Sequence, residues 1–237
     1  MAGVFIDLNI DGAKFSYFES PSEIEEKLSL LFIGLKFFFV FSFPLVLPLV
    51  YNEKTKNILD IGGNTGKWAI ASSKFSPDVH ITIMDLPGQL NVAKKRIEEL
   101  GLDKRVSFLP VNILDEQTKI PTGFDTIWMS QFLDCFSEAE IVSILKRCYD
   151  ALNENGQVII MEPFWDRQKF EVGAFCLQQL SVYFTVMANG NSQMYSSETF
   201  IKCIEQAGLE IVEQTDNIGL SQTLIKCKKK NKNYENR

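Results

Sequence analysis

The stretch from Asn57 to Lys67, which reads NILDIGGNTGK, constrains the fold of this chain more than any other. Ile58, Leu59 and Ile61 are apolar, as in a buried strand, and three glycines follow. Glycine at such a turn lets a ligand approach the backbone, and the start of the helix expected next offers free N–H groups. Strand, glycine turn and helix together predict a nucleotide-binding unit of an α/β protein.

The spacing of the glycines narrows the choice of ligand. A dinucleotide-binding turn reads G-x-G-x-x-G, whereas Gly62, Gly63 and Gly66 give G-G-x-x-G. An acid, Asp60, lies in the strand just before them. A glycine turn alone is weak evidence, because any tight connection between a strand and a helix favours glycine. A ligand site is therefore predicted only if the neighbouring strands end in residues that complete it.

Downstream of the glycines, strand and helix patterns alternate, which predicts a parallel sheet covered by helices on both faces. The expected strands are 57–61, 79–84, 106–110, 125–129, 157–161, 209–214 and 223–227. The expected helices are 67–75, 90–100, 137–152, 170–187 and 197–207. A short turn joins the last two strands, so one of them is expected to be antiparallel. The predicted fold is Rossmann-like α/β, with a seven-stranded, mostly parallel sheet and an antiparallel edge strand.

Composition excludes several classes of protein. A net charge of −6 over 237 residues gives no electrostatic support to a nucleic-acid partner. The five cysteines are scattered and none forms C-x-x-C, so neither a zinc site nor a disulfide framework is indicated, and a reducing, cytoplasmic compartment fits. No metal is implied, because the sequence shows no set of histidines or clustered carboxylates.

Residues 28–50 form a Phe-rich, apolar stretch broken only by one glycine, Lys36, two serines and two prolines. It is long enough to cross a bilayer, but a lysine in the hydrocarbon costs roughly 2.5–3.5 kcal/mol on insertion scales. A buried helix or an interface between copies is favoured over membrane association or a truncated N-terminus, and no signal-peptide features frame the stretch. The expected organisation is an apolar, helical segment over 1–50, a ligand-binding domain over 51–228 and a polar tail over 229–237.

Further motifs follow the expected strands. Asp85-Leu-Pro-Gly88 comes directly after the second strand, where a carboxylate can reach ribose hydroxyls. Ser130-Gln-Phe-Leu-Asp-Cys-Phe136 follows the fourth strand, and Glu162-Pro163 ends the fifth. With the glycine turn, these motifs make residues 43–228 resemble the catalytic domain of the S-adenosylmethionine (SAM)-dependent O-methyltransferases of the plant caffeate and bacterial antibiotic type. Asp-Leu-Pro at this place is rather specific to that family.

The resemblance implies SAM as cofactor and methyl transfer to a small-molecule acceptor, most often to oxygen. The expected cofactor-binding residues are Asp60, Gly62, Gly63, Gly66, Asp85, Leu86, Asn112, Ile113 and Ser130. The family's glycine turn cradles the methionine part of SAM, and Asp85 matches its ribose-binding acid. Asn112 stands where the family has an Asp beside adenine. The alternatives are a catalytically silent SAM-binding scaffold and an NAD-dependent oxidoreductase, but the oxidoreductase motifs are missing.

The chain departs from the family at the catalytic base. Asp134-Cys135 replaces the family's His-Asp pair, and the only histidine, His80, lies at the wrong end of its strand for a ligand. Transferring a proton from a phenol to an unperturbed aspartate is uphill by about six pKa units, or roughly 8 kcal/mol. Asp134 is therefore a poor base unless burial or a neighbouring carboxylate raises its pKa. Glu162, which ends the fifth strand, is a candidate for that neighbour, so Asp134 and Glu162 are the candidate catalytic residues. The alternatives are an acceptor more acidic or more nucleophilic than a phenol, or a domain that binds SAM without transferring methyl.

The second departure lies at the N-terminal end. Family members carry a larger N-terminal helical and winged-helix domain that dimerises and closes over the acceptor, whereas only residues 1–56 precede the first strand here. The Phe-rich stretch is a candidate remnant of such a homodimer interface. Candidate residues for the acceptor pocket, or alternatively for the core, are Trp165, Phe175, Gln179, Tyr183 and Met194.

Overall fold

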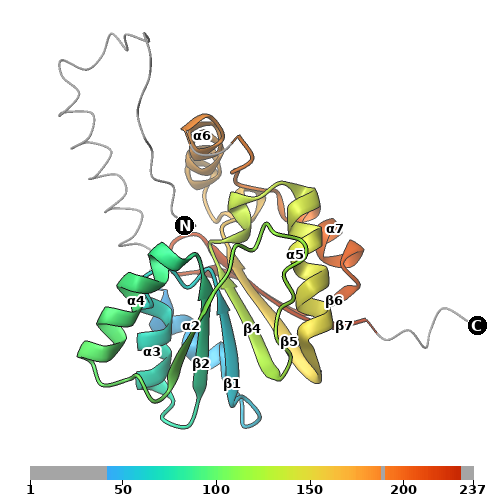
Figure 1. The fold of residues 1–237 in the computed structure, drawn as a ribbon. Helices are drawn as coiled ribbons and strands as arrows, with labels where there is room; N and C mark the ends of the chain where they lie inside the picture. Colours follow the sequence, from blue (N-terminus) through green and yellow to red (C-terminus); the bar gives the residue numbers. More distant parts are fainter. Residues whose placement is uncertain (1–41, 188–189, 231–237) are drawn as a thin grey trace, which may run out of the picture.

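A seven-stranded sheet forms the centre of the protein in a computed structural model that describes residues 42–187 and 190–230 (Figure 1). The strands are β1 (Asn57–Ile61), β2 (His80–Asp85), β3 (Val106–Pro110), β4 (Phe124–Ser130), β5 (Leu152–Glu162), β6 (Leu209–Ile218) and β7 (Gln222–Lys229). Their order is β3-β2-β1-β4-β5-β7-β6. The first five pair in parallel, and β7 runs antiparallel to β5 and to the edge strand β6. The predicted fold class is confirmed.

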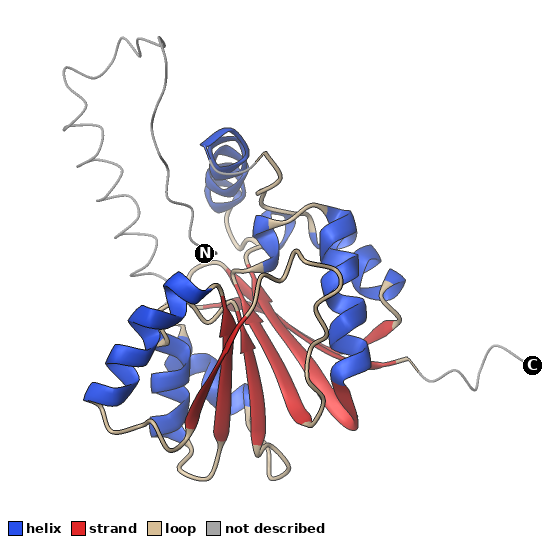
Figure 2. Cartoon of the chain, viewed as in Figure 1, coloured by secondary structure: helices blue, strands red, loops and turns tan. Residues whose placement is uncertain are grey.

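Helices cover both faces of this sheet (Figure 2). One face packs against α2 (Phe43–Val50), α3 (Lys67–Phe75) and α4 (Pro87–Glu99), and the other against α5 (Glu138–Ala151) and α7 (Ser197–Gln206). The helix α6 (Glu171–Met187) stands beyond the carboxyl ends of the strands. Two short 3₁₀ helices, η1 (Leu133–Cys135) and η2 (Trp165–Arg167), follow β4 and β5. The helices η1, η2 and α6 therefore lie at the carboxyl ends of the strands, apart from the helices that cover the two faces.

The alternation of side chains along the strands produces the two apolar layers. Leu59 and Ile61 join the cluster beneath α5 and α7, while Ile58 joins the cluster beneath α2, α3 and α4. All three are fully buried or nearly so. Asp60 lies on the same face as Ile58, so a carboxylate enters an otherwise apolar layer directly before the glycine turn.

The boundary between α5 and β5 differs from the prediction. Asn155 and Gly156 were expected to end the helix before a strand at 157, but β5 begins at Leu152, directly after α5. Leu152 pairs with Phe124 across a register shift, and its side chain packs against Gly156, where a Cβ would stand 2.9 Å from it. Asn155-Gly156 therefore lies inside an irregular strand rather than in a turn. Glycine is found at both kinds of site, and here it makes room for the Leu152 side chain.

The helix α2 places the end of the apolar stretch in the core. Its buried side chains are Phe43, Val46, Leu47 and Val50. The Phe43 ring meets the Trp68 ring of α3 edge to face, with 5.2 Å between centroids. The expectation of a buried helix thus holds for these residues, whereas 28–41 lie outside the described residues. In the described ranges, every helix is too short or too polar to cross a membrane.

This packing predicts opposite effects for two leucines of α2. Leu47 is 6% exposed, whereas Leu45 is 55% exposed. We expect Leu47→Ala to lower the free energy of unfolding by about 2–5 kcal/mol, because it removes buried methyl groups and leaves a cavity. Leu45→Ala should change it by less than about 0.5 kcal/mol. Urea unfolding measures both values, and equal values would show that α2 does not belong to the folded core.

Candidate functional site

The glycine turn presents bare backbone at the carboxyl end of β1. Gly62 and Gly66 both have φ of +74°, which favours glycine. A Cβ on Gly62 would collide with the Phe132 ring, and a Cβ on Gly63 would stand 2.5 Å from Asp60 Oδ2. The turn is therefore packed so closely that its residues at 62 and 63 can carry no side chain.

The carboxylate of Asp85 fastens this turn to the end of β2. Its Oδ2 accepts the Asn64 N–H at 2.8 Å, and its Oδ1 accepts the Leu86 N–H at 2.7 Å. Asp85 is only 6% exposed, and burial raises its pKa while the two hydrogen bonds oppose the rise. Carboxylate oxygens can accept more than one hydrogen bond each, so Asp85 retains capacity for ligand hydroxyls.

The Asp60 side chain packs against the glycine turn. Its carboxyl lies against Gly63, and its Oδ2 has no hydrogen-bond partner within the described part of the chain. Burial raises the pKa of Asp60 to about 8, and the nearby charge of Asp85 adds to the rise. Asp60 is therefore mostly protonated at neutral pH. The prediction that Asp60 contacts the cofactor stays a prediction.

The other predicted cofactor residues follow β3 and β4. Asn112 is exposed and its Oδ1 accepts the Leu114 N–H at 3.1 Å, while Ile113 is buried in the core. Ser130 is half-buried at the end of β4. Since β3, β2, β1 and β4 are neighbours and parallel, all the predicted cofactor-binding residues lie at or near the carboxyl ends of these strands. We call this side of the sheet the ligand-binding edge.

Two carboxyl groups lie beyond β4 and β5. Glu162 is 1% exposed, and its Oε1 accepts the N–H groups of Phe132 and Leu133, both at 2.9 Å. Burial raises the pKa of Glu162 well above its ordinary value, and the charge of Asp134 raises it further. Burial also raises the pKa of Asp134, against the Cys135 thiol, which donates to Asp134 Oδ1 at 3.5 Å. The pair therefore disfavours a doubly charged state.

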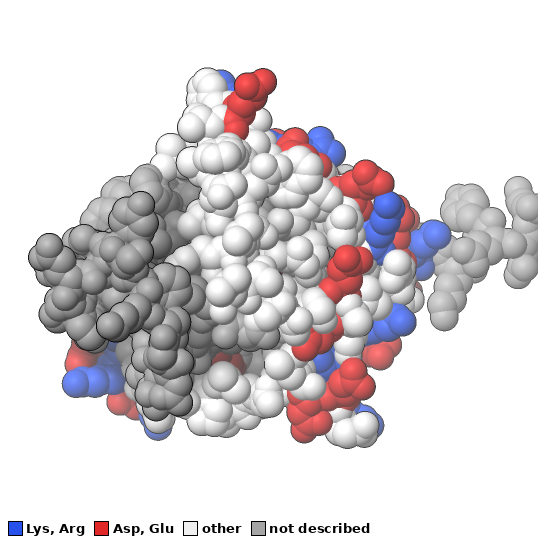
Figure 3. Space-filling view, turned by 90° about the horizontal axis from the view of Figure 1, so that it is seen from above, with Lys and Arg blue, Asp and Glu red and all other residues white. Residues whose placement is uncertain are grey.

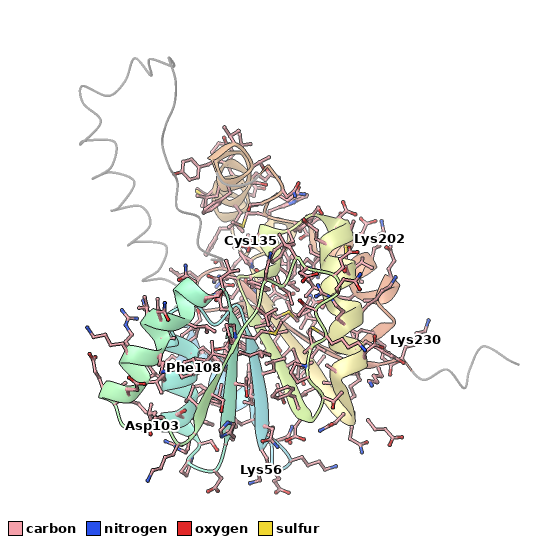
Figure 4. All side chains as sticks on the ribbon, in the orientation of Figure 1. Lys56, Asp103, Phe108, Cys135, Lys202 and Lys230 are labelled. Carbon is pink, nitrogen blue, oxygen red and sulfur yellow. The ribbon has the colours of Figure 1, made fainter. Side chains whose placement is uncertain are left out.

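A short return segment, residues 192–195, holds η1 in place. Gln193 N–H donates to the Asp134 carbonyl at 2.9 Å, and the Tyr195 hydroxyl donates to the Phe136 carbonyl at 2.6 Å. Figure 4 shows Cys135, the last residue of η1, at the carboxyl end of the sheet, with Lys56 at the opposite end. The backbone around Asp134 is thus fixed at the ligand-binding edge.

The predicted acceptor-side residues separate into two groups. Trp165, Tyr183 and Met194 are half-buried, whereas Phe175 is 59% exposed and Gln179 is also exposed. The alternative that Phe175 and Gln179 pack in the core is therefore wrong, because α6 stands apart from the sheet and turns this face outward.

Sequence reasoning gave no role to two residues that shape the site. Gln131 has φ of +48°, and its buried Nε2 has no hydrogen-bond partner among the described residues. Phe132 packs its ring against Gly62. Both belong to the motif Ser130–Phe136, which the sequence analysis singled out. A positive φ at a non-glycine residue, however, cannot be recognised from the residue type.

A separate cavity of about 350 Å³ opens beside the start of α5. Its lining residues are Ser137, Glu138, Ala139, Thr185, Gly190, Asn191 and Gln193. None of them comes from the glycine turn or the end of β2, so this cavity is not the nucleotide-binding edge.

Comparison with known families agrees with this geometry. The model of the O-methyltransferase domain family matches residues 25–210, well over half of the chain. This chain belongs to that family.

Relatives within and around the family differ in the atom that they methylate. An L-tyrosine C(3)-methyltransferase of Streptomyces lavendulae is 28% identical over 154 residues, which are 65% of this chain and 41% of that protein. A norreticuline-7-O-methyltransferase of Papaver somniferum is 27% identical over 159 residues, 67% of this chain and 41% of that protein. The chain thus spans about two-fifths of the length of these relatives.

Solved structures share the fold. The apo form of the SAM-dependent methyltransferase SibL superimposes with a TM-score of 0.73 at 24% identity, over 86% of this chain and 59% of that one. An O-methyltransferase of neocarzinostatin biosynthesis, solved with S-adenosyl-L-homocysteine and 1,4-dihydroxy-2-naphthoic acid, gives a TM-score of 0.65 at 20% identity over 86% of this chain and 60% of that one.

Substitutions at two glycines, Gly63 and Gly88, test whether the glycine turn binds the cofactor. A Cβ at Gly63 would meet Asp60 and Ile83, whereas a Cβ at Gly88, in the first turn of α4, meets nothing within 4 Å. We expect Gly63→Ala to displace the turn and weaken binding of S-adenosyl-L-homocysteine at least about tenfold, a change of about 1.4 kcal/mol. Gly88→Ala should leave it unchanged. Calorimetry on both variants checks this, and equal affinities would remove the turn from the site.

The raised pKa of Asp60 predicts a pH dependence of stability. Between its ordinary pKa of 3.8 and about 8, the folded chain holds a proton that the unfolded chain has lost. Stability therefore falls as pH rises through this window, by up to about 1.4 kcal/mol per pH unit for one proton. Asp60→Asn should flatten the slope between pH 5 and 8, whereas the exposed Asp103→Asn should not. Urea unfolding at four pH values tests this, and an unchanged slope in Asp60→Asn would contradict the buried proton.

Proposed function

We propose that this chain is a SAM-dependent methyltransferase domain that transfers a methyl group to a hydroxyl oxygen of a small molecule. The observation that carries the proposal is the glycine turn held against the Asp85 carboxylate, with the carboxyl groups of Asp134 and the buried Glu162 at the same end of the strands. Membership of the O-methyltransferase domain family supports it.

The residues at the edge fit a nucleoside cofactor. Gly62 and Gly63 allow a tight turn that no larger residue fits, and Asp85 keeps accepting capacity for two ribose hydroxyls. Ile113 offers an apolar side chain beside the expected adenine position. When bound, SAM would supply an electrophilic methyl group on its sulfonium. These residues bind and orient the cofactor, and none of them needs to react.

Asp134 is the proposed proton acceptor. Its raised pKa brings it closer to that of a hydroxyl acceptor, and each unit gained removes about 1.4 kcal/mol from the cost of proton transfer. The Glu162 carboxyl accepts hydrogen bonds from two backbone N–H groups after β4, so it positions the turn that carries Asp134. The proximity of bound reactants supplies the rest of the acceleration.

The surface above the strands favours an uncharged acceptor. Seen from above, the central surface that is not covered by grey residues is white, and the charged side chains lie around it, most of them on the right (Figure 3). The site itself contributes carboxyl groups, which would repel an acidic acceptor. A small aromatic alcohol or phenol satisfies both conditions.

The relatives' names allow other acceptor atoms, since they include a C(3)-methyltransferase and a phenazine-1-carboxylate N-methyltransferase of Pseudomonas aeruginosa. A silent SAM-binding scaffold remains the second candidate, because the family's His-Asp pair is replaced.

The proposal includes a cytoplasmic location, supported by free cysteines at all five positions. Homodimerisation or membrane contact through 28–50 stays a prediction. Ser42 is buried and residues 43–50 already bury their apolar face within the chain, so 28–41 remain for such a contact.

Two conservative variants test the carboxyl pair. We expect Asp134→Asn to lower turnover at least about tenfold, because the proton acceptor is lost, while calorimetry shows unchanged affinity for SAM. Glu162→Gln, which keeps an oxygen for the two N–H groups, should shift the acidic limb of the rate profile to lower pH, since it removes the competing carboxyl.

A radiolabelled methyl assay against phenols, hydroxyacids and amines measures turnover, with the exposed Asp103→Asn as control. Binding of SAM without transfer to any of these acceptors would favour the scaffold, and unchanged turnover in Asp134→Asn would remove its role as base.

A further inference from the structure

The outward face of α6 carries an apolar stripe, which we call the α6 stripe. Its members are Val172, Phe175, Gln179, Val182 and Val186. Its four apolar side chains are 59–76% exposed. Their spacing of three and four residues repeats over two heptads, the pattern by which one helix forms a seam for another. An exposed apolar seam of this length on a helix that stands apart from the sheet calls for a covering element.

Ser42, the first described residue, lies close to the segment that leads into α6. The Ser42 hydroxyl lies against Gly219 in the turn between β6 and β7. The same turn anchors the residues before α6, because Gln168 Nε2 donates to the Ser221 carbonyl at 3.0 Å. Ser42 therefore lies at the same turn as the segment that leads into α6.

The residues that immediately precede Ser42 match the stripe in length and character. Residues 28–41 read LSLLFIGLKFFFVF and carry a single charge, Lys36. As a helix, fourteen residues span about 20 Å, and the distance along α6 from Val172 to Val186 is about the same. Each segment also has its polar position near the middle, since Gln178 and Gln179 interrupt the apolar residues of α6.

We propose that residues 28–41 pack on the α6 stripe of the same chain, antiparallel to α6. This direction follows from the position of Ser42, and it brings Lys36 level with Gln178 and Gln179. Direct attachment gives the segment a high effective concentration at the stripe, which a second copy or a membrane lacks. An anionic membrane surface is further disfavoured because Glu171 is the only charged residue of α6.

Docking on α6 would also bear on the segment that carries Asp134, because α6 is linked to it. The return segment hydrogen-bonds to α6 through Thr185 Oγ1, which donates to the Ser192 carbonyl at 2.8 Å, and through Ser181 Oγ, which accepts the Met194 N–H at 3.1 Å. The same segment binds the backbone of Asp134. Only this consequence rests on the proposed function; the docking itself does not.

Cross-linking tests the docking. In a Cys176→Ser background, which removes the one exposed thiol among the described cysteines, Lys36→Cys is paired with Gln178→Cys and treated with a short bismaleimide. The control pairs Lys36→Cys with Glu154→Cys, an exposed position on β5. We expect the first pair to link at least about fivefold more than the control. Mixing ¹⁵N-labelled and unlabelled chains shows whether the link is within one chain.

A second set of variants tests the stripe itself. Phe175→Asp combined with Val182→Asp should lower the yield of the link at least about fivefold, because both charges would be buried in the seam. Val212→Asp, at a comparably exposed valine of β6, should leave the yield unchanged. Yields equal to that of the control pair, links mainly between chains, or links that persist in the doubly substituted chain would each overturn the proposal.

Calorimetry with SAM on the same proteins separates this inference from the proposed function. A link within one chain that forms in a protein unable to bind SAM would support the docking while removing the cofactor. Normal SAM binding without the link would overturn the docking and leave the cofactor proposal standing.

Discussion

The hydrogen bonds of Asp85 are the constraint on which the candidate site depends. One carboxylate accepts the N–H of Asn64 in the glycine turn and the N–H of Leu86 at the start of α4. It thus joins the ends of β1 and β2, two strands that are already paired along their length. Without it, the turn would present unsatisfied N–H groups in a largely buried place, at a cost of about 1–3 kcal/mol for each. The geometry of a ligand site here is therefore set by the fold before any ligand arrives.

Four acidic side chains gather at the carboxyl ends of the strands, an arrangement that lowers the stability of the fold. Asp60, Asp85, Asp134 and Glu162 all have raised pKa values, with burial as the main cause. Burying a carboxyl group without a cation lowers stability at neutral pH, because the charged form loses its hydration. Perturbed groups clustered at the carboxyl ends of parallel strands are typical of functional sites. Their placement argues that the edge has been shaped for chemistry rather than for stability.

The sequence predicted the parts of this protein that depend on local pattern. The strand 106–110 and the helix 67–75 were predicted to the residue. Arg105 and Gly66 mark where these two elements begin. The sequence also singled out the glycines at 62–66 and Asp85, because a glycine cluster and an acid at a strand end are compositional signals. Their role in binding a cofactor stays a prediction. The start of β5 was predicted wrongly, because Asn155 and Gly156 resemble a turn although they lie in an irregular strand.

What could not be predicted depends on contacts between distant residues. The close packing of Asp60 and Ile83 around Gly63 is one such contact, and the sequence pattern alone does not contain it. Likewise, a helical spacing at Phe175, Gln179 and Tyr183 gave no sign of which residues would face outward. That outcome followed from the position of α6 beyond the strand ends.

The link between α6 and Asp134 explains why this position matters. The return segment hydrogen-bonds on one side to the Ser181 and Thr185 side chains of α6 and on the other to the Asp134 and Phe136 carbonyls. A shift of α6 would therefore be transmitted to η1 through hydrogen bonds rather than through a flexible loop. An element that packs on α6 would thus also set the position of the candidate base. Acceptor recognition and proton transfer would then depend on the same helix.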